Sequence, residues 1–407
     1  MVNRNKELLV NTIVLSIGQI IPKLLALLIL PILTTYLSTK DYGLYELSLS
    51  VASFCVPLIS VQIQQAVFRY LIEDKSNANY IISASFYFIL LSFVIFVLPI
   101  AYLWYLYTGQ VSVSIMFCLV YFSEMLLTWS GQTVRGLGGN LLYSIAYIIY
   151  SCSFLSLIII FLVMKNSLSI EDTIISMIIS YLLASSFLFV KKNLFKFIKV
   201  KCIKRKTLYM LINYSSPMII SSIALWVVNL SDRFFVSGFL GIEIMAMYAV
   251  ANKIPNLFNS FYGIFNLAWT ENASKLSDKE KKGTYYSNFF EYFYSVMVGM
   301  MLVLICISPI VFKLLINKQY NSAIDLMPWL FIGAFFNSLV SFFGSIYVGE
   351  KRTKDVGVSS AVGAVINVLI NLVFMKKFGI IIAALSTIIS FAIICLYEKY
   401  ALHTCES

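Results

Sequence analysis

Twelve long apolar segments, separated by short polar ones, make up almost the whole chain. A helix needs about 20 mostly apolar residues to cross a bilayer, and each segment is long enough or nearly so. We predict membrane-spanning helices at residues 9–36, 43–68, 80–107, 111–134, 141–164, 170–190, 208–238, 243–268, 285–312, 322–348, 355–375 and 379–399. The first segment is too long for the apolar region of a signal peptide, so we expect it to stay in the mature protein.

Composition supports an all-α integral membrane protein and excludes several other classes. The chain has 407 residues, of which 60% are hydrophobic and 12% charged, against about 25% charged residues in soluble domains. Its seven cysteines are scattered without a CxxC motif, and His403 is the single histidine. We therefore expect no metal site, no cofactor, no catalytic centre and no nucleic-acid partner.

Lysine and arginine predict the orientation of these helices. With the N-terminus placed inside, 21 of the 30 basic residues fall in the tails and loops of that side. Six fall on the opposite side, and Lys23, Arg233 and Lys253 lie within predicted spans. Because basic residues concentrate on the cytoplasmic side of membrane proteins, we expect both termini to be cytoplasmic.

A strongly basic loop divides the chain near its middle. The sequence "KKNLFKFIKVKCIKRK" at 191–206 carries eight Lys and Arg. One interpretation is a topology signal that lies on anionic lipid; the other is a docking site for a cytoplasmic partner. We expect an N-terminal six-helix bundle at 1–190, a linker at 191–207 and a C-terminal six-helix bundle at 208–407.

The two halves resemble each other in sequence. The segment "YLSTKDYGLYEL" at 36–47 aligns with "FLGIEIMAMYAV" at 239–250, and "GQTVRG" at 131–136 aligns with "GSIYVG" at 344–349. Six spans per half make both halves enter the membrane in the same sense, which predicts a substrate site between them near the midplane. This arrangement is typical of transporters that alternate between inward-facing and outward-facing states.

The predicted outside loops are short, from about three to ten residues by the span boundaries above. Membrane enzymes that polymerise or ligate sugars on the outer face usually need a sizeable external loop. The pattern therefore favours a transporter over an enzyme.

Charged residues within the spans raise the question of what compensates them, since a charge at the centre of a membrane helix costs about 2.5–3.5 kcal/mol. Asp232 and Arg233 are adjacent, so their side chains point about 100° apart on a helix. In one interpretation each pairs with another helix, or Arg233 reaches the outer interface. In the other, Arg233, Lys253 and Lys23 line a water-filled cationic cavity and Asp232 holds Arg233 in place. Glu124, near the midplane, either compensates these cations or carries a coupling proton.

The eighth predicted span carries a row of amides. Asn252, Asn256 and Asn259 are spaced to share one helical face, which Lys253 borders, and Pro255 favours a kink. This face either forms hydrogen bonds between helices or faces sugars.

Basic residues also mark one end of two predicted spans. Arg69 and Arg135 lie at the cytoplasmic ends of the second and fourth spans, where we expect a substrate to enter.

Cations and amides together predict an anionic, sugar-rich substrate, because the Arg guanidinium matches phosphate geometry. A drug or metal-cation exporter would be expected to have mainly acidic residues in the cavity.

Four segments resemble a known family. "NYSSPMIISSIALWVVNLSDRFFVSGFLGIEIMAMYAVANKI" at 213–254 is similar to the seventh and eighth spans of Wzx-type polysaccharide flippases of the multidrug/oligosaccharidyl-lipid/polysaccharide exporter superfamily. "DYGLYEL" at 41–47, "TVRGLGG" at 133–139 and "SIYVGEKRTKDVGVSSAVGAVINVLINLVFMKKFGIIIAALST" at 345–387 look like the same family.

This resemblance implies a fold and a function. The fold is two pseudo-symmetric six-helix bundles of the MATE type with a cationic cavity. The function is transfer of undecaprenyl-pyrophosphate-linked oligosaccharide repeat units to the outer leaflet of the cytoplasmic membrane, for O-antigen, capsule or another polymer. Arg233 and Lys253 would bind the pyrophosphate or acidic sugars, and Asp232 or Glu124 would couple transport to protons or sodium. Neighbouring partners would be membrane lipids, a polysaccharide polymerase and glycosyltransferases. Two alternatives are a multidrug or cation exporter and a non-transporting assembly partner of glycosyltransferases.

Overall fold

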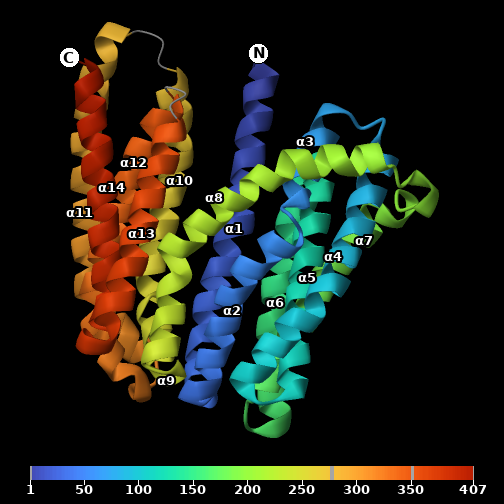
Figure 1. The fold of residues 1–407 in the computed structure, drawn as a ribbon, viewed down its shortest axis with the longest axis horizontal. Coiled ribbons are helices and arrows are strands. Elements are labelled where there is room, and N and C mark those ends of the chain that lie inside the picture. The colour runs from blue at the N-terminus through green and yellow to red at the C-terminus, as the bar shows by residue number, and fades with distance from the viewer. Residues whose placement is uncertain (1, 276–278, 350–352, 407) are drawn as a thin grey trace. The chain divides into compact units, whose positions relative to one another are not determined.

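The computed structural model describes residues 2–275, 279–349 and 353–406, and these are almost entirely helical. In chain order, the α-helices are α1 (Val2–Tyr36), α2 (Thr39–Ile59), α3 (Ile63–Glu73), α4 (Ala78–Thr108), α5 (Val111–Gly136), α6 (Asn140–Lys165), α7 (Ile170–Lys191), α8 (Arg205–Phe239), α9 (Ile242–Ala251), α10 (Lys253–Lys275), α11 (Lys279–Leu315), α12 (Met327–Gly349), α13 (Thr353–Phe378) and α14 (Ile381–Glu406) (Figure 1). Three 3-10 helices join them: η1 (Leu194–Lys196), η2 (Val200–Cys202) and η3 (Lys318–Leu326).

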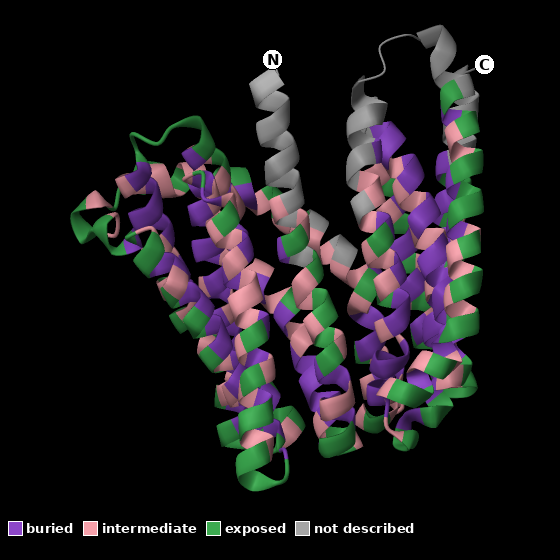
Figure 2. Cartoon of the chain, turned by 180° about the vertical axis from the view of Figure 1, so that it is seen from behind, coloured by how far each residue is buried: buried purple, intermediate pink, exposed green. Residues whose placement is uncertain are grey.

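The predicted apolar segments all fall on helices, and the described residues contain ten helical segments long and apolar enough to cross a membrane. The other two predicted spans correspond to α8 and to α9 with α10. Large apolar side chains such as Leu98, Met164 and Leu314 are more than three-quarters exposed. Exposed residues follow the outer faces of the helices in Figure 2. Apolar outer faces of this kind suit lipid, and the chain is a multi-pass membrane protein.

Two predicted spans are interrupted. Residues 43–68 form α2 and α3, because the backbone between them turns through the left-handed region at Val61 (φ 51°) and Gln62 (φ 54°). Residues 243–268 form α9 and α10, which meet at Asn252. Pro255 has no N–H to donate to the carbonyl of Ala251, four residues earlier, which favours a break at this point.

The chain forms two compact units. Unit 1 comprises residues 1–41 and 48–223, and unit 2 comprises residues 42–47 and 224–407. The start of α2 therefore belongs to unit 2, and α8 contributes its first part to unit 1 and its second part to unit 2. The sequence-based division at 191–207 stays a prediction.

Helix α5 is the centre of unit 1 and contacts α3, α4, α6 and α7. Trp129 on α5 is fully buried and donates a hydrogen bond to Ser85 Oγ on α4 at 3.0 Å. A Cβ on Gly136 would lie 2.7 Å from Leu71 Cβ, so glycine allows α3 and α5 to approach closely.

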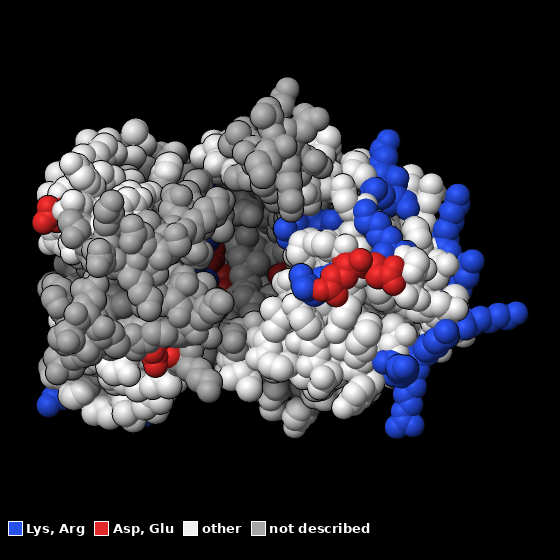
Figure 3. All heavy atoms as spheres, turned by 90° about the horizontal axis from the view of Figure 1, so that it is seen from above, with Lys and Arg blue, Asp and Glu red and all other residues white. Residues whose placement is uncertain are grey.

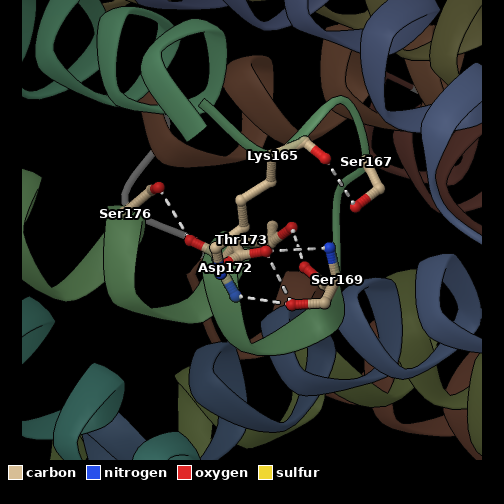
Figure 4. A network of polar contacts seen from close by, with 6 residues as sticks. All are labelled: Lys165, Ser167, Ser169, Asp172, Thr173 and Ser176. Atoms are coloured by element: carbon tan, nitrogen blue, oxygen red, sulfur yellow. Dashed lines mark hydrogen bonds and ion pairs between the residues drawn. The ribbon is translucent and has the colours of Figure 1, made fainter. Parts of the chain in front are cut away.

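A network of polar contacts lies in the turn between α6 and α7 of this unit (Figure 4). Ser169 and Asp172 form a reciprocal capping box at the start of α7. Lys165, the last residue of α6, forms an ion pair with Asp172.

Helix α12 is the centre of unit 2 and contacts α10, α11, α13 and α14. Its Phe342 stacks on Trp269 of α10 with the ring centroids 4.7 Å apart. The packing of α10, α12 and α14 around this aromatic core positions the polar residues of the candidate site.

Candidate functional site

A polar cavity lies within unit 2 and has a volume of about 210 Å³. The polar residues that line it are Asn229, Asp232, Arg233, Tyr248, Asn252, Asn256, Asn259, Asn337 and Thr387. They come from α8, α9, α10, α12 and α14. Five of the nine are asparagines, Arg233 is a cation and Asp232 is an acid, so amide groups predominate among the polar residues. The rest of the lining is apolar, with residues such as Leu230, Leu330 and Phe391.

Arg233 lines this cavity and forms an ion pair with Glu46 of α2. The distance from Arg233 Nη1 to Glu46 Oε2 is 3.2 Å, and Lys253 Nζ lies 2.6 Å from Glu46 Oε1. Tyr42 OH donates a hydrogen bond to Oε1 at 2.9 Å, which is the third polar contact of this carboxylate. The Glu46 side chain is 1% exposed. One buried carboxylate therefore compensates two cations, and the cluster of Glu46, Arg233 and Lys253 keeps one net positive charge.

The sequence indicates Arg233 and Lys253 as site residues but not Glu46. The sequence does contain a signal for Glu46: it is a carboxylate inside the predicted span 43–68. It follows Tyr42 by four residues and therefore lies on the same helical face. Arg233 both pairs with another helix and lines a cavity, so each of the two interpretations holds in part. Its ion-pair partner is Glu46 and not Asp232, which was expected to hold it in place, and Lys253 is not among the residues that line the cavity.

Asp232 is surrounded by neutral hydrogen-bond donors. Its Oδ1 accepts from Asn371 Nδ2 at 2.7 Å, and its Oδ2 accepts from Thr387 Oγ1 at 2.7 Å and from Tyr248 OH at 3.1 Å. Ser386 Oγ lies 3.4 Å from Oδ1. These donors come from α9, α13 and α14, whereas the ion pair of Arg233 is with Glu46 of α2. The adjacent charges thus have separate sets of partners, as their 100° separation predicts.

The side chains around Asp232 provide oxygen atoms of the kind that bind a proton or a hard cation. The Asp232 carboxylate lies within hydrogen-bonding distance of the Thr387 and Ser386 hydroxyls and of Asn371 Nδ2, which also donates to Ser386 Oγ. Hard cations prefer such oxygen ligands. The sequence did not indicate Asn371, Ser386 or Thr387, because they are more than 130 positions away from Asp232 in the chain.

The predicted asparagines share the cavity wall. Asn252 donates to the Tyr248 carbonyl at 3.1 Å, and Asn256 is exposed. The Oδ1 of Asn259 is buried and has no hydrogen-bond partner among the described residues. Such an acceptor is costly to leave unsatisfied, so it favours a donor in the cavity. Asn229 and Asn337 also line the cavity and were missed, although Asn229 lies one helical turn before Arg233.

Lys23 and Glu124 lie in unit 1. Lys23 is an exposed residue of α1, and Glu124 is a half-buried residue of α5. Neither lines the cavity of unit 2. Their assignment to substrate binding and coupling stays a prediction.

The predicted entrance residues also lie in unit 1, at the ends of α3 and α5. Arg69 forms an ion pair with Glu73 one turn along α3. The guanidinium of Arg135 lies over the rings of Phe68 and Tyr143, at 4.6 and 5.1 Å from their centroids. Arg135 is therefore held in place by cation–π contacts, and its role at an entrance stays a prediction.

Comparison with known proteins gives matches over most of the chain. The family described as "Polysaccharide biosynthesis protein" matches residues 8–270, and the family MatE matches residues 217–373. An uncharacterized membrane protein of Methanocaldococcus jannaschii is 24% identical over 392 residues, which cover 89% of this chain and 77% of that protein.

Solved structures of transporters are similar in fold. An inward-facing multidrug resistance MATE family transporter of the MOP superfamily superposes with a TM-score of 0.76 at 12% identity, covering 96% of this chain and 95% of that chain. The lipid II flippase MurJ in its inward closed conformation gives 0.66 at 15% identity, covering 96% and 87%. At these identities the likeness concerns the fold, and it confirms the predicted all-α, MATE-like class.

Proposed function

Because this chain belongs to the polysaccharide biosynthesis protein family, we propose that it is a Wzx-type flippase for undecaprenyl-pyrophosphate-linked oligosaccharide repeat units. It moves each unit from the inner to the outer leaflet of the cytoplasmic membrane, with both termini in the cytoplasm. Glycosyltransferases supply the unit, and a polymerase on the other side extends it into O-antigen, capsule or a related surface polysaccharide.

The observation that carries this proposal is the composition of the cavity in unit 2. Asparagine side chains both donate and accept hydrogen bonds, so they match the hydroxyl groups of a sugar. Arg233 adds a fork of N–H donors for a phosphate or a sugar carboxylate. A wall of this kind suits a polar, anionic glycan better than an apolar cation.

In the proposed mechanism, the glycan and its pyrophosphate enter the cavity while the prenyl chain stays in lipid. Arg233 and Lys253 bind the pyrophosphate or acidic sugars, and Asn252, Asn256 and Asn259 bind hydroxyl groups. Lys23 contributes a third cation, and Arg69 and Arg135 attract the headgroup at the cytoplasmic entrance. Two six-helix bundles, residues 1–190 and 208–407, then alternate in their access to the two sides, as is general for transporters built from repeats.

Coupling to a cation gradient completes the proposal. Asp232 is the first candidate for the coupling carboxylate because hydroxyl and amide groups surround both of its oxygens. Glu124 of α5 is the second candidate. Protons and sodium ions are the cations that such sites accept.

The experiment that tests this function measures flipping of a fluorescent polyprenyl-pyrophosphate oligosaccharide in vesicles that contain the purified protein. Arg233→Gln is expected to lower the flipping rate at least about tenfold, since a charge-assisted hydrogen bond is roughly twice as strong as a neutral one. Lys377→Gln, an exposed lysine of α13, is the matched control and should leave the rate unchanged.

The same vesicles separate the alternatives. Uptake of cationic dyes together with no movement of the lipid-linked glycan would identify a multidrug or cation exporter, the class to which the MATE fold also points. If the vesicles transport neither substrate but retain added glycosyltransferases on their membrane, the protein is an assembly partner. Either result would overturn the proposal.

A further inference from the structure

The basic loop between α7 and α8 has a defined structure. It contains two short 3-10 helices, η1 and η2, closed by backbone hydrogen bonds of 2.9 to 3.1 Å. Ser83 of α4 fixes the connection between them: its Oγ donates to the Phe197 carbonyl at 2.8 Å and accepts from the Lys199 N–H at 2.9 Å. Leu194 is fully buried. The loop is therefore attached to unit 1 and is not a free linker.

Apolar and cationic side chains alternate on its exposed surface. Phe195 and Val200 are 70% and 66% exposed, and Ile203 is also exposed. Lys196, Lys199 and Lys201 are exposed between them. A soluble surface rarely carries this combination, whereas it is typical of segments that lie in the interface of a membrane, with apolar groups inserted and cations at the headgroups.

The charge of this surface is of one sign. The sequence contains no Asp or Glu between Asp172 and Asp232. Figure 3 shows the Lys and Arg side chains gathered over the end of unit 1 where α7 ends and α8 begins. The acids at this end, in the turn before α4, have partners of their own: Glu73 pairs with Arg69, and Asp74 accepts from Ser76 and Asn77.

We infer that residues 191–206 form a folded binding surface for anionic phospholipid headgroups of the leaflet beside this end of unit 1. The lysines contact the headgroup phosphates, and Phe195 and Val200 insert beside the first carbons of the acyl chains. The inference is independent of the transported substrate. It goes beyond a topology signal, because it requires a fixed backbone and exposed apolar side chains as well as charge.

The test uses the full-length protein with a fluorophore on Cys202, a half-buried residue of η2, after replacement of the other six cysteines. The protein is placed in phosphatidylcholine vesicles that contain phosphatidylglycerol, and bromine is carried on the chains of one lipid or the other. Brominated phosphatidylglycerol is expected to quench at least about twofold more than brominated phosphatidylcholine at equal mole fraction, with a difference that high salt reduces.

Three variants make the result specific. Replacing Lys196, Lys199 and Lys201 together by Gln should abolish the preference, whereas replacing them together by Arg should retain it. Lys376→Gln with Lys377→Gln on α13 should change nothing. Equal quenching by both lipids in the unmodified loop would overturn the inference. So would a fluorophore that only aqueous iodide quenches, because the loop would then lie in water and not at the lipid headgroups. Labelling of the N-terminus from one side confirms that each variant keeps its orientation.

Discussion

Glu46→Gln is expected to destabilise the protein by about 3 kcal/mol or more, the cost of leaving buried charges without their partner. The substitution removes a carboxylate that contacts both Arg233 and Lys253. Arg233 is 9% exposed and the Lys253 side chain is 28% exposed, so we expect the loss of the partner to cost most at Arg233. The midpoint of thermal unfolding, followed by a cysteine-reactive dye in detergent, and the flipping rate should both fall.

The matched control is Glu243→Gln, an exposed glutamate of α9, which should leave the unfolding midpoint unchanged. Adding Lys253→Gln to Glu46→Gln rebalances the cluster and should recover part of the lost stability. An additive double variant, with no recovery, would show that the three side chains do not act as one cluster.

Asp232→Asn is expected to abolish stimulation of flipping by an imposed cation gradient. The amide group has the same shape, but it replaces one carboxylate oxygen by a donor that faces the hydroxyl or amide donors of α9, α13 and α14. The negative charge that would hold a proton or sodium ion is lost. The measurement compares flipping in vesicles with a sodium gradient, with a pH gradient and with neither.

For this variant the control is Asp325→Asn, an exposed residue of η3, which should respond to the gradient as the unmodified protein does. If Asp232→Asn keeps its response and Glu124→Gln loses it, the coupling carboxylate is in unit 1. That result would be compatible with the flippase function, but it would contradict the assignment of Asp232 as the coupling carboxylate.

Much of the fold is predictable from the apolar pattern, because a membrane span depends on local composition and length. The pattern does not reveal the interruption at Val61 and Gln62, where two non-glycine residues adopt left-handed backbone conformations. Pro255 does indicate a disturbance near the start of α10, and the structure has a helix break there, at Asn252.

The candidate site is predictable only in part. Arg233, Asp232 and Lys253 are visible because charge is rare inside a span. Their partners are not visible, since which carboxylate meets which cation depends on helix packing: Glu46 is 187 residues from Arg233, and Thr387 is 155 residues from Asp232. Asn337 carries no local signal in its apolar segment either.

Cysteine labelling tests most directly whether the cavity of unit 2 binds the lipid-linked glycan. Single cysteines are placed by Asn256→Cys in the cavity wall and by Asn321→Cys on the exposed surface of η3, each in a background without the seven native cysteines. We expect a membrane-impermeant maleimide to label both, and excess undecaprenyl-pyrophosphate oligosaccharide to protect position 256 alone. Labelling of position 256 that the glycan leaves unchanged, or that fails from both sides of the membrane, would contradict a substrate site in this cavity.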